Sequence, residues 1–178
     1  GVFKSTDSGK SWRKVCDEIG FSDVRVWRLI AFGDKKSSGI RSVYVAGTGT
    51  NRTGVWKSDD LGESWTQVLK DVVCKQLDVD GERIVAACDS DGIYISNDGG
   101  MTWTNNCKGI EKKVILAATF DPENSEHILA ISKDELFESV DGGDSWSLLC
   151  DRDFIKANYL RNLLYGPVDK DGHSRLYL

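Results

Sequence analysis

The sequence predicts an all-β fold made of repeated four-stranded antiparallel sheets, and three observations support this prediction. First, the octapeptide pattern Ser-x-Asp-x-Gly-x-[Ser/Thr]-Trp recurs along the chain at intervals of roughly 40–50 residues. Second, short runs with a hydrophobic period of two flank each copy, as strands do. Third, turns rich in Gly and Asp separate these runs, and no segment has the apolar spacing of a long amphipathic helix.

The octapeptide is predicted to form a tight corner between two strands. Its Gly can take backbone angles closed to other residues, and its Asp carboxylate can accept hydrogen bonds from nearby backbone N–H groups. Its Trp offers a large apolar surface beside the turn, where the next strand begins. The residues expected to build the corners are Ser5, Asp7, Gly9 and Trp12; Ser58, Asp60, Gly62 and Trp65; Ser96, Asp98, Gly100 and Trp103; and Ser139, Asp141, Gly143 and Trp146.

These corners resemble the Asp-box, or BNR repeat, of β-propeller proteins. The run from Gly54 to Trp65 is similar to blades of sialidases, xyloglucanase-type glycosidases, sortilin/Vps10 receptors and photosystem II assembly factors. The resemblance implies a β-propeller of four-stranded antiparallel blades. It also implies that each box lies between the third and fourth strands, away from the central channel, so that its Asp is structural. Because these families perform different functions on one scaffold, the resemblance predicts the fold more narrowly than the function.

In chain order, the pattern predicts about four blade-equivalents in one propeller domain or fragment that spans residues 1–178. Residues 1–16 would supply the last two strands of a blade, and residues 158–178 the first two strands of another. Complete blades are expected at about residues 24–69, 72–107 and 114–150.

Each complete blade has its own strand and turn signals. Asp80-Gly81 is a strong hairpin signal, and the longer loop at Thr48–Thr53 is of the kind that often carries binding residues. The predicted first and second strands are Val24–Phe32 and Ser42–Gly47, then Val72–Val79 and Arg83–Cys88, then Val114–Phe120 and His127–Ser132.

The two half-blades are complementary, because one holds third and fourth strands and the other holds first and second strands. We favour the interpretation that the chain is a fragment of a ring with roughly six to eight blades. Alternatively, two copies pair their open half-blades as a homodimer, or a single chain closes as four blades, the least favoured arrangement because it leaves almost no channel. Open half-blades would expose strand edges and invite association.

Composition excludes several classes of function. The chain has 178 residues and a formal net charge of −5, so we expect no general attraction to nucleic acid or acidic membranes. No apolar run approaches the ~20 residues of a membrane helix. No Cys-x-x-Cys pair supports a zinc site, and the Asp-rich turns lack the full spacing of a calcium loop, so neither a metal nor a cofactor is expected. An extracellular or cell-surface location is implied by the family resemblance alone.

The five cysteines are interpreted from their positions in the repeat. Cys16, Cys107 and Cys150 each follow a box Trp by four residues, where the remaining repeat has Leu69, so we expect them to be small core residues on different blades. Cys74 and Cys88 fall on neighbouring predicted strands of one blade. A cross-strand disulfide between these two is the less favoured of two interpretations.

Ligands of propellers bind at one mouth of the channel, which the innermost strands line. Basic residues lie on or beside the predicted innermost strands, and a basic mouth would suit a carboxylate, a sulfate or an acidic peptide. The alternative, which we favour at this point, is that they are solvated charges at strand ends. The candidate ligand-binding residues are Arg25, Arg28, Lys75, Lys113 and Arg161.

The favoured function is therefore a non-enzymatic scaffold that binds a protein or a glycan. One alternative is part of a glycoside hydrolase. A sialidase-like enzyme is disfavoured because the early Arg-Ile-Pro motif is absent. A xyloglucanase-like enzyme would need two Asp residues across a cleft, about 6.5–9.5 Å apart if it inverts configuration. The candidates, Asp23, Asp34, Asp78, Asp89 and Asp121, cannot be ranked by spacing. A further alternative is an assembly factor for a protein complex.

Overall fold

The computed structural model describes residues 2–15, 25–35, 41–48, 53–89, 91–151, 163–166 and 176–177, and the regular structure in these ranges is all β-strand. The strands form three four-stranded sheets and two hairpins, and every pairing is antiparallel. The predicted fold class is confirmed. Within the described ranges, no helix has the length and apolar character needed to cross a membrane.

In each four-stranded sheet, strands that follow one another in the chain are neighbours. Blade 1 contains β3 (Arg25–Lys35), β4 (Arg41–Thr48), β5 (Thr53–Ser58) and β6 (Thr66–Lys70). Blade 2 contains β7 (Cys74–Asp80), β8 (Arg83–Cys88), β9 (Gly92–Ser96) and β10 (Thr104–Asn105). Blade 3 contains β11 (Ala117–Asp121), β12 (Asn124–Ile131), β13 (Leu136–Ser139) and β14 (Ser147–Cys150). The N-terminal hairpin is β1 (Phe3–Lys4) with β2 (Arg13–Lys14), and the C-terminal hairpin is β15 (Leu164–Tyr165) with β16 (Leu176–Tyr177).

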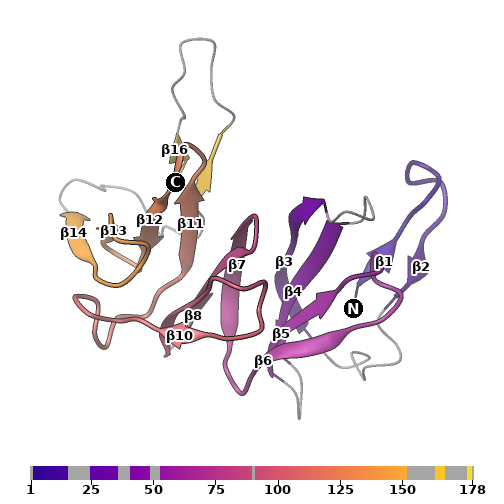
Figure 1. Cartoon of the computed structure of the whole chain (residues 1–178), viewed down its shortest axis with the longest axis horizontal. Coiled ribbons are helices and arrows are strands. Elements are labelled where there is room, and N and C mark those ends of the chain that lie inside the picture. The colour runs from indigo at the N-terminus through magenta and orange to yellow at the C-terminus, as the bar shows by residue number, and fades with distance from the viewer. Residues whose placement is uncertain are drawn as a thin grey trace.

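The blades stand side by side in chain order and form an open arc (Figure 1). The N-terminal hairpin lies next to blade 1 at one end, and at the other end the C-terminal hairpin contacts β11 through β15. An apolar layer fills the space between each pair of neighbours, and burial of one large apolar side chain in such a layer stabilises by roughly 1.5–3 kcal/mol. Representative residues of the four layers, from the N-terminal end, are Val15 with Trp56, Tyr44 with Leu77, Ile93 with Phe137, and Leu129 with Leu163.

Each Asp-box forms a corner held by its own Ser and Asp. In blade 3, Ser139 Oγ donates to Asp141 Oδ1 at 2.7 Å and accepts from Gly143 N at 2.8 Å. The Ser145 backbone N–H and hydroxyl donate to the two oxygens of the Asp141 carboxylate, at 2.9 and 2.5 Å. Equivalent bonds surround the carboxylates of Asp7, Asp60 and Asp98.

In the three complete blades, the Gly of the box also lies against the sheet or hairpin that precedes it in the chain. A Cβ at Gly143, where φ is +94°, would lie 1.9 Å from Ile95 Cδ1 of blade 2. A Cβ at Gly100 would lie 3.3 Å from Val68 Cγ2, and a Cβ at Gly62 would lie 3.3 Å from Val15 Cγ2. The box therefore needs Gly both for the left-handed turn and for the close approach of two blades.

The Trp and the turn of each box add polar contacts across the same junctions. Trp65 Nε1 donates to the Val15 carbonyl at 2.7 Å, and Trp146 Nε1 donates to the Asn106 carbonyl at 3.2 Å. Each Trp was expected to pack beside its own turn, and these two also reach the preceding sheet. Trp146 is consequently only 5% exposed, whereas Trp12, in the first box, is 64% exposed.

Two side chains on second strands donate to box turns of the next blade. Tyr44 Oη donates to the Gly99 carbonyl at 3.2 Å, and Arg83 Nη2 donates to the Gly142 carbonyl at 3.2 Å. Arg83 also pairs with Glu126 at 2.8 Å. Hydrogen bonds and apolar contacts thus converge on the boxes from the preceding blade.

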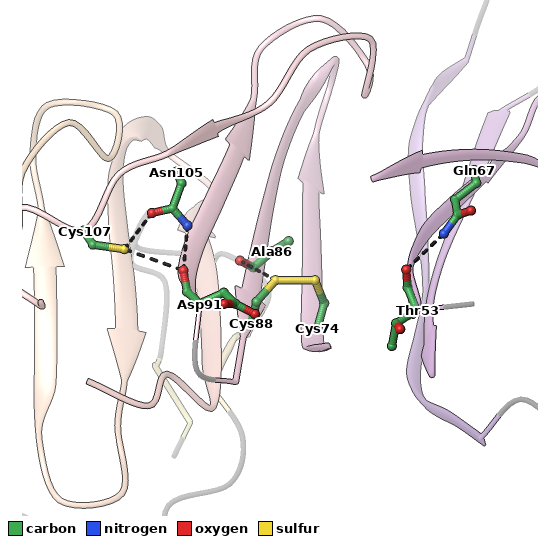
Figure 2. The surroundings of a disulfide bond; sticks show 8 residues. All are labelled: Thr53, Gln67, Cys74, Ala86, Cys88, Asp91, Asn105 and Cys107. Carbon is green, nitrogen blue, oxygen red and sulfur yellow. Dashed lines mark hydrogen bonds between the residues drawn. A yellow bond between two sulfur atoms is a disulfide. The ribbon is translucent and has the colours of Figure 1, made fainter. Parts of the chain in front are cut away.

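The cysteine interpretation requires one correction. Cys74 and Cys88 form a disulfide between β7 and β8, so the less favoured alternative is the one present in the structure (Figure 2). The two residues are direct cross-strand partners and both are buried, a register that the sequence alone did not reveal. Cys107 and Cys150 are free thiols packed at the edges of two apolar layers, and Cys16 lies outside the described residues.

Replacing Gly143 by Ala should destabilise the chain more than the same change at Gly9. At both positions the backbone has a positive φ, and this left-handed conformation costs roughly 1–2 kcal/mol for a residue with a Cβ. Only at Gly143 does the new methyl meet a neighbouring blade, which adds about 1–3 kcal/mol. Urea unfolding of G143A and G9A at low protein concentration measures the difference. Equal losses for the two variants would show that box glycines do not serve blade packing.

Candidate functional site

The first strands of the blades lie innermost, because β7 contacts both β3 and β11, and β11 contacts β15. Successive blades repeat the same strand order, so these strands begin at one end of the array, which we call the inner mouth. Lys75 lies at the start of β7, and Lys113 precedes β11. Arg25 and Arg28 lie on β3, opposite Thr48 and Ala46 of β4. Their side chains, and Arg161 as a whole, lie outside the described part of the chain.

The two described lysines are each neutralised within their own blade. Lys75 Nζ lies 2.8 Å from Asp89 Oδ1, and Lys113 Nζ lies 2.6 Å from Glu135 Oε2. Lys113 also stands over the ring of Phe137, with its Nζ 5.9 Å from the ring centroid. All four charged side chains are partly exposed, so water screens both pairs. Such ion pairs contribute little to stability, roughly 0–1 kcal/mol each, and exchange readily with other charged partners.

Asp78 joins the inner strands of blades 2 and 3. Its Oδ2 accepts from Thr119 Oγ1 at 2.6 Å and from Phe120 N at 3.0 Å, and its Oδ1 accepts from Val79 N at 2.9 Å. Burial raises the pKa of Asp78 above its usual value, although these hydrogen bonds act in the opposite direction. The carboxyl group is thus a partly desolvated acid that holds two blades together.

Gln76 joins blade 2 to the C-terminal hairpin. Its Nε2 donates to the carbonyl of Leu163, which directly precedes β15, at 3.1 Å. Its Oε1 is buried and accepts no hydrogen bond in the described structure. A buried acceptor without a donor costs free energy, so Gln76 joins the two elements at some cost in stability.

The other acidic candidates are engaged or lie outside the described side chains. Asp89 pairs with Lys75. Asp121 Oδ2 lies 3.0 Å from His127 Nδ1; burial opposes ionisation of Asp121, but hydrogen bonds led by that from His127 outweigh it and lower the pKa. Asp34 belongs to β3, whose side chains are not described, and Asp23 lies outside the described residues.

The box carboxylates are unsuited to acid catalysis. Hydrogen bonds led by those from Ser11 and Ser64 lower the pKa of Asp7 and of Asp60 to about 2. The pKa values of Asp98 and Asp141 are lowered in the same way, with the largest contributions from Thr102 and Ser139. These groups stay ionised at neutral pH, and their oxygens already accept hydrogen bonds within the turn.

The charged and polar side chains described near the inner mouth thus form ion pairs and hydrogen bonds. Within the described ranges, no three His, Cys, Asp or Glu side chains gather to hold a metal ion. Sequence reasoning missed Gln76 and Thr119, which are single polar residues in strand positions without a motif. It also did not identify Asp89 and Glu135 as the ion-pair partners, because they lie in turns beside other strands of the same blade.

The variant Thr119→Val should lose about 1.5–3 kcal/mol of unfolding free energy at pH 7, because it removes a donor to a charged group. The folded pKa of Asp78 is raised, so its carboxylate costs stability above that pKa, and the cost disappears as the pH falls through it. The deficit of T119V should therefore shrink towards about pH 4. T119S keeps the hydroxyl and should show a smaller deficit of about 1 kcal/mol that does not change with pH. Parallel pH dependences in urea unfolding would contradict this role.

Comparisons with known proteins agree with this architecture. The BNR/Asp-box repeat family matches residues 94–105, which contain the box of blade 2. A GH74 enzyme from Niastella koreensis superposes with a TM-score of 0.66 at 18% identity, covering 84% of this chain and 26% of the enzyme. The GH74 xyloglucanase from Xanthomonas campestris gives 0.61 at 18% identity, with 84% and 27% covered.

A third similar structure is YCF48 bound to D1 peptide, with a TM-score of 0.56 at 14% identity, covering 78% of this chain and 44% of YCF48. The chain thus spans about a quarter of the length of the two GH74 structures and less than half of that of YCF48. No curated protein sequence gives a significant match. At these identities the likeness shows the fold alone. Together with the box geometry, it shows that this chain carries the BNR/Asp-box repeat on the blades of a β-propeller fold.

Proposed function

We propose that the chain is a non-enzymatic scaffold that binds an acidic protein segment at the inner mouth. The observation that supports this most directly is the placement of Lys75 and Lys113. Both stand where inner strands begin, and the charge of each is paired with a partly exposed carboxylate. A carboxylate of a ligand could take the place of Asp89 or Glu135 at little cost, because exposed ion pairs are weak.

A peptide ligand is also in keeping with one of the similar structures. The similar YCF48 structure holds a D1 peptide, so a fold of this type accepts a protein segment. In this proposal Arg25, Arg28 and Arg161 add positive charge at the same mouth. An assembly factor that holds a segment of another subunit would use the same binding mode.

A second candidate function is glycoside hydrolysis, favoured by two observations. Two GH74 structures share the blade architecture, and the raised pKa of Asp78 is a property that a general acid requires. Against it, both oxygens of Asp78 already accept hydrogen bonds. Asp89 and Asp121, the other described candidates, are also engaged, by Lys75 and His127. A hydrolase needs a second carboxylate facing the first across the bond that is cleaved.

Peptide binding provides the test. A fluorescent peptide rich in Asp and Glu should bind the chain, a Lys-rich peptide of equal length should not, and added salt should weaken the binding. The double variant Lys75→Gln/Lys113→Gln should raise the dissociation constant about tenfold, equivalent to about 1.4 kcal/mol. Lys10→Gln, which removes an exposed charge from the first box, is the matched control.

Three outcomes would contradict the proposal. Binding of both peptides with equal affinity, or no effect of the double variant, would place the site elsewhere. Release of sugars from xyloglucan that Asp78→Asn abolishes would establish the enzymatic alternative instead. A glycan array with wild-type chain distinguishes sugar binding from protein binding.

A further inference from the structure

The disulfide of blade 2 lies at the mouth end of its two inner strands. Cys74 begins β7 and Cys88 ends β8, and both residues are buried (Figure 2). The next residue along the chain from each is charged. These two residues are Lys75 and Asp89, whose side chains form the ion pair described above, at 2.8 Å. The covalent link and the ion pair therefore join the same two strand ends.

Lys75 is the extra residue of a β-bulge. The cross-strand pair Cys74–Cys88 is followed by the pair Gln76–Ala87, so β7 has one residue more than β8 between the two pairs. That residue is Lys75, and no residue of β8 lies directly opposite it. A bulge interrupts the ladder of hydrogen bonds and re-aims the side chain of its extra residue. The side-chain direction of Lys75 thus depends on the shape of the bulge.

The bulge also separates Lys75 from the packing on both faces of the sheet. Cys74 and Leu77, three residues apart, lie in the same apolar layer between blades 1 and 2. Between them, Gln76 donates to the carbonyl of Leu163 in the direction of the C-terminal hairpin. The residues before and after Lys75 are thus fixed by contacts with neighbouring elements. Lys75 itself makes its described contact with Asp89, at the end of the blade.

Few noncovalent contacts hold the two strand ends together at this point. The amide of Asp89 donates to the carbonyl of Val73 at 2.8 Å. The ion pair between Lys75 and Asp89 is partly exposed, and pairs of this kind contribute little to stability. The disulfide is therefore the strongest link beside the bulge.

We propose that the Cys74–Cys88 disulfide is a positioning element of the inner mouth, which locks the bulge and so presents Lys75 to an acidic ligand. Without this link the strand ends separate more easily, and Lys75 must then be ordered when the ligand binds, which weakens affinity. The ligand rests on the function proposed above, whereas the locked bulge follows from the strand pairing. Lys113 belongs to blade 3 and pairs with Glu135, so its contribution is independent of the disulfide.

A double-mutant cycle with the fluorescent peptide rich in Asp and Glu tests the positioning role. In the wild-type background, Lys75→Gln and Lys113→Gln should each raise the dissociation constant about threefold. The variant Cys74→Val/Cys88→Val keeps apolar, strand-forming side chains but cannot form the link, and it should also bind about threefold more weakly. In this background Lys113→Gln should keep its effect, whereas Lys75→Gln should have almost none, because coupled residues are not additive. Cys150→Val, at a free thiol of blade 3, is the matched control and should bind like the wild type.

Hydrogen exchange tests the locked bulge without any ligand. The amide of Asp89 lies beside the disulfide, and its exchange reports opening of the strand ends. The amide of Gly99 donates to the carbonyl of Glu82 at 2.8 Å, near the opposite end of β8, and serves as the internal reference. In the valine variant, exchange at Asp89 should become about tenfold faster, whereas exchange at Gly99 should stay the same.

Two results would overturn the inference: an undiminished effect of K75Q in the valine variant, or unchanged exchange at Asp89. Either would show that the bulge keeps its shape without the disulfide. If the wild-type chain binds no acidic peptide, the proposed function fails, and exchange at Asp89 still decides whether the disulfide locks the bulge. Cooperative unfolding of the valine variant verifies its fold, and Cys74→Ala/Cys88→Ala replaces it if the larger side chains overpack the site.

Discussion

The close approach of each box turn to the preceding blade is the constraint on which the rest of the structure depends. Ser and Asp side chains hold the turn in shape, and the turn presents a Gly without a Cβ to its neighbour. At Gly143 there is no room for a methyl group beside Ile95. The pattern that recurs in the sequence therefore specifies a junction between sheets as well as a bend within one. This explains why Ser, Asp, Gly and Trp recur together, since each serves part of the same contact.

An array built from such junctions is stabilised by nearest-neighbour contacts, as in other repeat proteins. Tyr44, Arg83 and Asp78 each reach from one blade to the next, and an apolar layer lies at every junction. The disulfide between Cys74 and Cys88 adds a covalent link between the two inner strands of blade 2 (Figure 2). At the inner mouth, Lys75 and Lys113 are held by partly exposed carboxylates and not by packing between blades. Trp12 in the N-terminal hairpin is exposed because its box has no described neighbouring blade to pack on.

The sequence was sufficient to predict the repeat, the strand order and the turn residues, because these depend on local patterns. It could not predict contacts that depend on register between strands or on the distance between blades. Cys74 and Cys88 were placed on neighbouring strands, but only the pairing of β7 with β8 puts them opposite one another. The four box Trp residues look equivalent in sequence, whereas their burial depends on which blade precedes them. The role of Lys75 and Lys113 in ligand binding stays a prediction, and their ion-pair partners come from elsewhere in each blade and carry no motif. Arg161 and the side chains of Arg25 and Arg28 lie outside the described residues, so their part in the site stays a prediction.

Hydrogen exchange at four equivalent amides tests the central claim most directly. The amides of Gly9, Gly62, Gly100 and Gly143 all donate to the box Ser hydroxyl at 2.7–2.8 Å, so their local hydrogen bonds are alike. They differ in whether a preceding blade packs on the turn. At low protein concentration, we predict slow exchange at Gly62, Gly100 and Gly143 and fast exchange at Gly9. Equal protection at all four would show that the corner is stable by itself and that blade contact is not what holds it.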